Sequence, residues 1–192
     1  MRRHDYAVDP PKPMLLDVPA ERKVRVLGVG KIHDIYNGRG VDEYLTTKGN
    51  ADGMEKFTTA AKERKDGLIF CNLVDFDMLH GHRKHVEGFA KSLEEFDRML
   101  REFLPLLSLS DLLMITADHG CEPDPRWPTT DHSREYVPIL AYSPGSAAGV
   151  NLAVRDTLAD MGQTIAENFG ATISHGKSFL RELTGRIAES AR

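Results

Sequence analysis

Two short apolar runs in this 192-residue chain each end in acidic and histidine residues. The runs cover residues 68–74 and 111–117 and have the length of single strands. The acidic and histidine residues that follow them are Asp75, Asp77, His80, His82, Asp118 and His119. Because ligands collect at the carboxyl ends of strands in open α/β sheets, the two runs together predict a polar site at one edge of such a sheet.

The mixture of Asp and His side chains is typical of sites for transition metals such as zinc or manganese, whereas calcium takes oxygen ligands alone. A further Asp-His pair follows across a loop rich in Pro and Asp. The five candidate ligands are Asp77, His82, Asp118, His119 and His132. They are too many for one catalytic ion that keeps an open position, but they suit two ions held about 3.5–4 Å apart. The sequence therefore predicts a two-metal centre.

The other histidines are expected to be surface or hydrogen-bonded side chains, namely His4, His33, His80, His85 and His175. Three more acidic residues are expected to form turns or to accept hydrogen bonds from a ligating histidine: Asp75, Asp124 and Asp131. The run Gly28-Val-Gly30-Lys31 has the spacing of neither glycine-rich phosphate-binding motif. Nucleotide binding is therefore not expected there.

Strand and helix patterns alternate along the chain. We expect strands at residues 23–30, 67–74, 111–117 and 136–142, and helices at residues 52–64, 85–107, 157–169 and 179–191. The glycine-rich residues 32–50 are expected to form a loop, and the proline-rich residues 1–22 an extended connector. This alternation predicts an α/β fold with a mostly parallel sheet flanked by helices.

The expected helix at 85–107 carries an apolar stripe whose members are spaced by four and three residues in turn: Phe89, Leu93, Phe96, Leu100, Phe103 and Leu107. Such a stripe fits either a coiled coil or a helix packed on a sheet. The alternation of strands and helices around it favours packing on a sheet.

Composition argues against several classes of partner. Hydrophobic residues make up 41% of the chain and charged residues 28%, as in an ordinary globular domain with a core. The net charge of −4 gives no general attraction to nucleic acid or an anionic membrane, and no apolar run approaches the roughly 20 residues that span a bilayer. The N-terminus lacks the apolar segment of a secretory signal, and Cys71 and Cys121 do not suggest a disulfide framework. These features predict a protein of the reducing cytoplasm.

Three motifs surround the candidate ligands: Val74-Asp-Phe-Asp77 with Gly81-His82-Arg83, then Thr116-Ala-Asp-His-Gly120, and then Thr130-Asp-His-Ser-Arg-Glu-Tyr136. Together they resemble the bacterial phosphopentomutases, which belong to the alkaline phosphatase superfamily of metalloenzymes. The resemblance extends to Gly30-Lys31-Ile and to residues 47–54 and 165–170. Asp-His-Gly alone marks only the superfamily, whereas the combination is much more specific.

This resemblance implies an alkaline phosphatase-like core and a particular reaction. In the family two manganese ions sit against a phosphorylated threonine, and ribose or deoxyribose phosphate exchanges its phosphoryl group between positions 5 and 1, with a sugar bisphosphate as activator. The residues that resemble ligands of one ion are Asp77, His82 and His132, and those that resemble ligands of the other are Asp118 and His119. Lys31 resembles a lysine near the substrate phosphate.

The sequence departs from the family in its extent. The family's N-terminal half carries a further metal-binding Asp, the nucleophilic Thr and a cap domain. Residues 1–22 are therefore expected to be a connector returning from the cap, and residues 23–192 the C-terminal part of an incomplete core domain. No threonine of this chain matches the nucleophile position, so the chain alone is expected to be inactive as a mutase. The loop 121–131 is also slightly longer than the family's usual form.

Two other interpretations stay open. One is a different enzyme of the superfamily, such as a cofactor-independent phosphoglycerate mutase or a phosphodiesterase, although residues 131–136 and 81–83 argue against it. The other is a non-catalytic metal-binding or assembly module. An in-frame Asp and Thr encoded upstream of Met1 would favour the enzyme over the module.

Overall fold

The computed structural model describes residues 7–10, 14–63, 66–146 and 149–184. Its regular elements in chain order are α1 (Asp17–Glu21), β1 (Val26–Val29), α2 (Ile32–Ile35), β2 (Glu43–Leu45), α3 (Asn50–Glu63), β3 (Leu68–Cys71), the π-helix η1 (Phe76–Gly81), α4 (Val86–Phe103), the 3₁₀ turn η2 (Leu104–Leu106), β4 (Leu113–Thr116), β5 (Ile139–Tyr142), α5 (Ala159–Asn168) and α6 (Leu180–Thr184). The four predicted strands are confirmed as β1, β3, β4 and β5, each shorter than expected.

The strands form two small sheets. β1 lies between β2 and β3 and runs parallel to both, with Gly28 in register with Tyr44 on one side and Phe70 on the other. β4 and β5 pair antiparallel, with Met114 opposite Ala141. The predicted α/β fold with a mostly parallel arrangement of strands is thereby confirmed.

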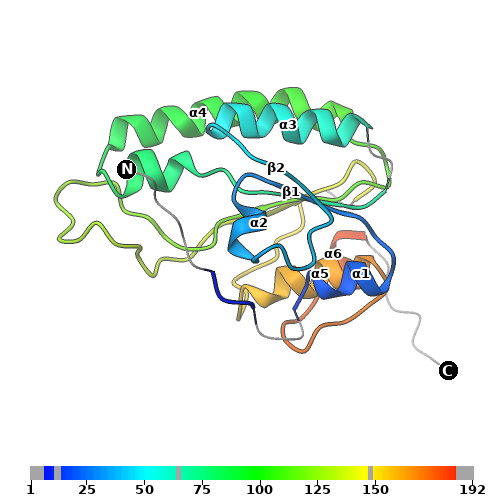
Figure 1. Ribbon diagram of the computed structural model, residues 1–192. Helices are drawn as coiled ribbons and strands as arrows, with labels where there is room; N and C mark the ends of the chain where they lie inside the picture. Colours follow the sequence, from blue (N-terminus) through cyan, green and yellow to red (C-terminus); the bar gives the residue numbers. More distant parts are fainter. Residues whose placement is uncertain (1–6, 11–13, 64–65, 147–148, 185–192) are drawn as a thin grey trace.

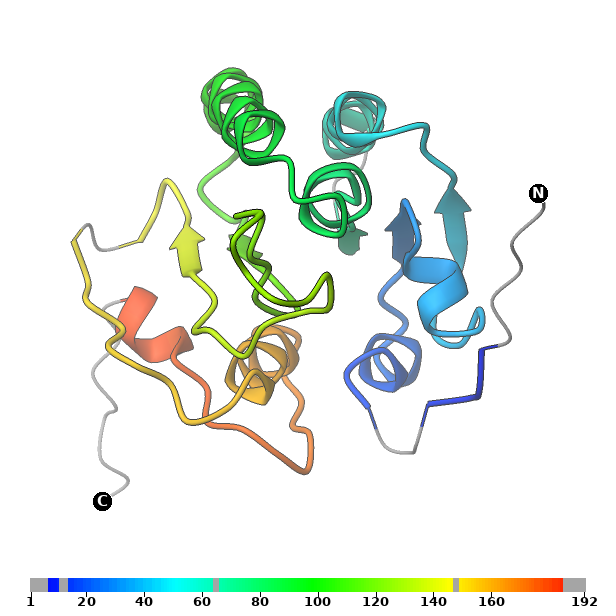
Figure 2. The same ribbon diagram turned by 90° about the vertical axis from the view of Figure 1, so that its left-hand side faces the viewer.

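Helices cover both sides of the strands. α3 and α4 lie on one side, whereas α1, α5 and α6 lie on the other (Figures 1 and 2). α3 contacts β1 and β3 directly, and Leu27 and Val29 of β1 pack with Ala60 of α3 in the buried core. Because all four residues of β1 are buried, this strand reads as a continuous apolar run, as expected for a strand covered on both faces.

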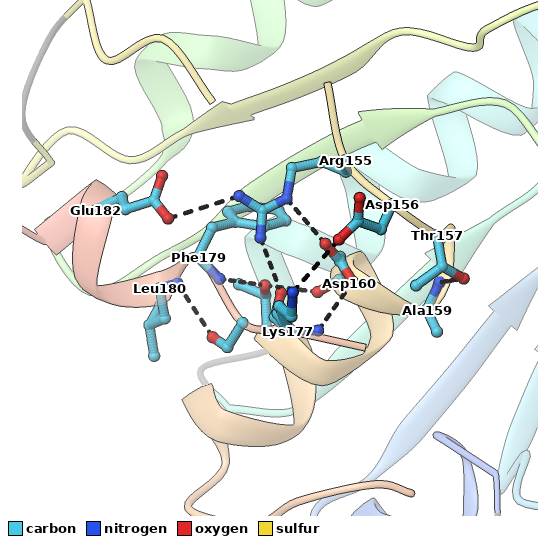
Figure 3. A network of polar contacts seen from close by, with 11 residues as sticks. Arg155, Asp156, Thr157, Ala159, Asp160, Lys177, Phe179, Leu180 and Glu182 are labelled. Atoms are coloured by element: carbon cyan, nitrogen blue, oxygen red, sulfur yellow. Dashed lines mark hydrogen bonds and ion pairs between the residues drawn. The ribbon is translucent and has the colours of Figure 1, made fainter. Parts of the chain in front are cut away.

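A buried ion pair fastens the last part of the chain to α5 (Figure 3). Asp160 is 2% exposed and accepts hydrogen bonds from Arg155 Nε at 2.9 Å and from the Lys177 backbone N–H at 2.8 Å. The Arg155 guanidinium also donates to the Lys177 carbonyl at 3.1 Å and lies over the Phe179 ring. The Phe179 N–H donates to the Thr164 hydroxyl at 3.0 Å. These contacts hold an irregular segment that has few backbone ladder bonds of its own.

The proline-rich N-terminal stretch is not wholly an extended connector, since it contains α1. The Asp17 carboxylate accepts hydrogen bonds from the Arg39 guanidinium at 2.6–3.0 Å and from the Met14 N–H at 2.9 Å. Leu16 and Val18 are buried beside it. A contact between residues 22 positions apart gives no local sequence pattern, which explains the error. The proposed boundary between residues 1–22 and 23–192 stays a prediction.

One more segment was wrongly expected to be irregular. Residues 32–50 contain α2 and β2, and all three residues of β2 are exposed, so the strand shows no apolar alternation. It forms because its backbone pairs with β1. The polar stretch after β3 coils into η1.

The aromatic residues of the apolar stripe of α4 contact helical neighbours. Phe89 and Phe96 contact the ring of Phe76 in η1, with centroids 5.5 and 6.5 Å apart, and Phe103 contacts Phe57 of α3 at 4.9 Å. Phe103 is 2% exposed, whereas Leu93 is 49% exposed. The stripe is thus buried at its C-terminal end and exposed to solvent in its middle.

The C-terminal helix expected at 179–191 is described only in part. α6 covers Leu180–Thr184, and residues 185–192 lie outside the described residues. Among the helices of the described ranges, none has the length and apolar content needed to cross a membrane.

Candidate metal centre

The π-helical turn after β3 places Asp77 and His82 side by side. The His82 N–H donates to the Asp77 carbonyl at 3.0 Å, which closes a turn of five residues and brings the two side chains to one face. As a result, His82 Nε2 lies 3.3 Å from Asp77 Oδ2. The predicted proximity of these two residues therefore depends on a helical form that the sequence pattern did not reveal.

The loop after β4 returns to its starting point and brings His132 against His119. Gly120 and Ser133 form an antiparallel bridge, in which the Ser133 N–H donates to the Gly120 carbonyl at 3.0 Å. The two imidazole rings stack with centroids 3.5 Å apart and planes 12° from parallel. His132 Nε2 also lies 3.5 Å from Asp77 Oδ1. The bridge thus places His132 beside His119, which follows β4, and beside Asp77, which follows β3.

Backbone carbonyls fix the orientation of two of the imidazoles. His82 Nδ1 lies 2.6 Å from the Thr130 carbonyl, and His119 Nδ1 lies 3.1 Å from the Gly120 carbonyl. A carbonyl can only accept, so each contact requires the proton on Nδ1, and Nε2 is then the atom of each ring that can bind a metal ion. Histidines that bind metal ions are commonly held in this way.

The five predicted ligands all lie in or beside this cluster. Ligand atoms of Asp77, His119 and His132 lie within 4.8 Å of one another, which is close enough for them to share an ion. His82 contacts Asp77, and Asp118 Oδ1 lies 3.6 Å from His119 Nε2 while its side chain is 74% exposed. The division into one site of three and another of two ligands stays a prediction, since His119 stacks on His132 and also contacts Asp118.

Lys31 lies apart from these side chains in its contacts. It follows β1 at the start of α2, at the same carboxyl edge of the strands that carries the cluster. Within the described ranges, no hydrogen bond or ion pair joins Lys31 to the five candidate ligands. Its role near a substrate phosphate stays a prediction.

The acidic residues expected in supporting roles have different partners. Asp75 accepts the Asn50 N–H at 2.6 Å and donates its own N–H to the Asn50 side chain at 2.9 Å, so it joins η1 to the start of α3 and does not hold a histidine. Asp131 accepts a hydrogen bond from Thr129, as a turn former does. Asp124 binds Arg126 in another turn, and this guanidinium lowers the Asp124 pKa to about 2.

Cys121 is a neighbour of the cluster that the sequence did not single out. Its Sγ lies 4.0 Å from Asp77 Oδ1, and a Cβ at Gly81 would lie 2.0 Å from this sulfur. Burial, and then the charges of Asp77 and Glu122, raise the Cys121 pKa, so the group is a neutral thiol at pH 7. Because a Cβ at position 81 would clash with the Cys121 sulfur, this position requires glycine.

The donor set fits divalent transition metals. It offers three imidazoles and two carboxylates, and these are the ligand types of zinc and manganese sites. The carboxylate of Asp77 faces two imidazoles at once, through Oδ1 toward His132 and Oδ2 toward His82. A carboxylate whose two oxygens face different imidazoles can belong to the same metal site as both of them.

The chain is similar to curated phosphopentomutases over nearly all of its own length. The chain is 54% identical to a phosphopentomutase of Desulfitobacterium hafniense over 182 residues, which is 94% of this chain and 46% of that protein. It is 51% identical to a phosphopentomutase of Clostridium novyi over 182 residues, with the same coverage. The chain thus spans about half the length of these curated relatives.

The fold is also similar to that of a phosphoglycerate mutase from Leishmania mexicana, with a TM-score of 0.66 over 85% of this chain and 38% of that one. At 16% sequence identity this likeness concerns the fold alone. The sequence model of the Metalloenzyme superfamily matches residues 26–173, which include β1 to α5 and every candidate ligand. The chain therefore belongs to the Metalloenzyme superfamily.

Proposed function

We propose that this chain is the C-terminal, metal-binding part of a phosphopentomutase, which interconverts the 5-phosphate and 1-phosphate of ribose or deoxyribose. The observation that carries the proposal is the convergence of Asp77, His82, His119 and His132 within a chain that is about half identical to phosphopentomutases. The same motifs favour this reaction over another phosphoryl transfer in the superfamily.

We propose that Asp77, His82, Asp118, His119 and His132 hold two divalent ions, with manganese as the metal. When bound, such ions supply positive charge to the oxygens of the transferred phosphoryl group. Residues of this chain provide the positions: the Thr130 and Gly120 carbonyls fix the rings of His82 and His119, and the Asp77 carboxylate faces His82 and His132. Lys31, at the same edge of the strands, would add a compact positive charge for the substrate phosphate.

The proposal also divides the work between this chain and the remainder of a longer enzyme. The nucleophilic threonine, a further Asp ligand and the cap that shields the pocket would come from the part of the relatives that this chain does not match. A phosphoryl transfer through a covalent intermediate needs its nucleophile at the metals. The chain alone should therefore not act as a mutase, although it should bind metal. A cytoplasmic location and activation by a sugar bisphosphate belong to the same proposal.

A chimeric enzyme tests the function directly. In the Desulfitobacterium hafniense phosphopentomutase, the matched 182-residue region is replaced by this chain. With manganese and a sugar bisphosphate activator, the chimera should interconvert ribose 5-phosphate and ribose 1-phosphate. His132→Ala should reduce its turnover by at least about 100-fold, whereas the same change at exposed His175 should leave it unchanged. A chimera that folds and binds manganese but has no activity on pentose phosphates would refute the proposed substrate.

A further inference from the structure

His80 and His85 form a pair that the candidate metal centre does not use. His80 lies in the last turn of η1, and His85 directly precedes α4. The His85 N–H donates to the His80 carbonyl at 2.8 Å, and the two ring centroids are 5.4 Å apart. The short turn between η1 and α4 therefore holds the two imidazoles next to each other.

Both imidazole rings approach Gly88 closely. A Cβ atom at this position would lie 2.4 Å from the Nδ1 atoms of both His80 and His85. Both nitrogens thus lie beside the same position in the first turn of α4. Glycine is a poor helix former compared with alanine, so its presence in this turn needs a packing reason, and the two rings supply one.

The Nδ1 atom of His80 is buried and has no hydrogen-bond partner within the described ranges. Buried polar atoms in folded proteins nearly always have a partner. The two basic side chains of the same turn are engaged elsewhere, since Arg83 donates to the Met78 carbonyl at 3.3 Å and Lys84 donates to the Trp127 carbonyl.

We propose that His80 and His85 bind one transition-metal ion through their Nδ1 atoms, at a site separate from the two-metal centre. Two imidazole nitrogens suit zinc, nickel or copper(II) and are poor ligands for magnesium or calcium. Because the His85 side chain is exposed, water completes the coordination from that side. An ion bound here links η1, which carries Asp77, to the start of α4.

Metal counting after saturation of the main centre tests this site. The chain is loaded with excess Mn²⁺ and then titrated with Ni²⁺, and bound nickel is counted by calorimetry and elemental analysis. The wild-type chain should bind one more Ni²⁺ than His85→Asn and His80→Asn. His175→Asn removes an exposed histidine outside the pair and should match the wild type. Nickel that replaces manganese at the main centre is the same in the wild type and the variants, so it cancels in the difference between them.

Gly88→Ala gives an independent variant because it keeps both histidines. Its Cβ would occupy the space between the two Nδ1 atoms, so the affinity of the extra Ni²⁺ should fall by at least about tenfold. If the wild type and His85→Asn bind equal amounts of nickel, the proposal is wrong. His85 is exposed, so this comparison holds even if His80→Asn fails to fold.

Discussion

Gly120 determines how closely His119 and His132 approach each other. A Cβ at this position would lie 2.6 Å from Ser133 Oγ and 3.0 Å from the Ser133 carbonyl, so Gly120→Ala must push the bridge apart. We expect manganese affinity to fall by about tenfold or more, because the stacked rings lose their alignment. Calorimetric titration measures the change. Gly162→Ala is the matched control, since its Cβ would meet only the flexible end of Ile173 at 3.3 Å; an equal loss in both variants would contradict this role for Gly120.

The Cys71 thiol makes the folding stability of the chain depend on pH in the alkaline range. Burial in β3 raises its pKa from 9.0 to about 12. Below pH 9 the thiol is protonated whether the chain is folded or unfolded; above pH 9 only the unfolded chain loses the proton, so stability falls as the pH rises toward 12. The slope from this group is at most about 1.4 kcal/mol per pH unit.

Urea unfolding of the wild type and Cys71→Ala between pH 8 and 10.5 isolates this contribution. The difference in unfolding free energy should shrink as the pH rises, because the variant lacks the titrating thiol. A difference that stays constant over this range would show that Cys71 ionises equally in both states.

At the scale of elements, the Arg155–Asp160 pair holds the segment before α6 onto α5. Asp160→Asn would leave the half-buried Arg155 guanidinium with only the Glu182 carboxylate, 3.6 Å away, and we expect a loss of about 3 kcal/mol in unfolding free energy. Asp156→Asn is the matched control, since Asp156 is 81% exposed and its contact with Lys177 is 3.4 Å long. The control should change stability by less than about 0.5 kcal/mol. Equal urea unfolding midpoints for Asp160→Asn and Asp156→Asn would mean that the Arg155–Asp160 pair does not contribute to stability.

Elements with a continuous local pattern could be predicted, and those held by distant partners could not. β1 and α3 carry their own apolar pattern and lie close to where the sequence placed them. α1 depends on Arg39, and the exposed β2 depends on backbone pairing with β1. Neither interaction leaves a trace in the neighbouring residues.

The candidate site follows the same rule at the level of the whole molecule. Its residue types were predictable because Asp and His follow two apolar runs whose ends meet at one edge of the strands. Their orientation was not predictable, because it comes from the π-helical turn that pairs Asp77 with His82 and from the Gly120–Ser133 bridge that returns His132 to His119. Both are backbone hydrogen bonds between residues that have no complementary side-chain signal.

The central claim is that the Asp77 cluster is a metal site, and a calorimetric titration of the purified chain with Mn²⁺ tests it most directly. One stronger site should form around Asp77, His82 and His132, with a weaker or empty second site at Asp118 and His119, because only two of the five candidate ligands are left for it. Asp77→Asn should abolish the stronger site, since its carboxylate faces two imidazoles. Equal, tight binding of two ions would contradict the asymmetry. An Asp77→Asn variant that binds manganese as the wild type does would contradict the claim itself.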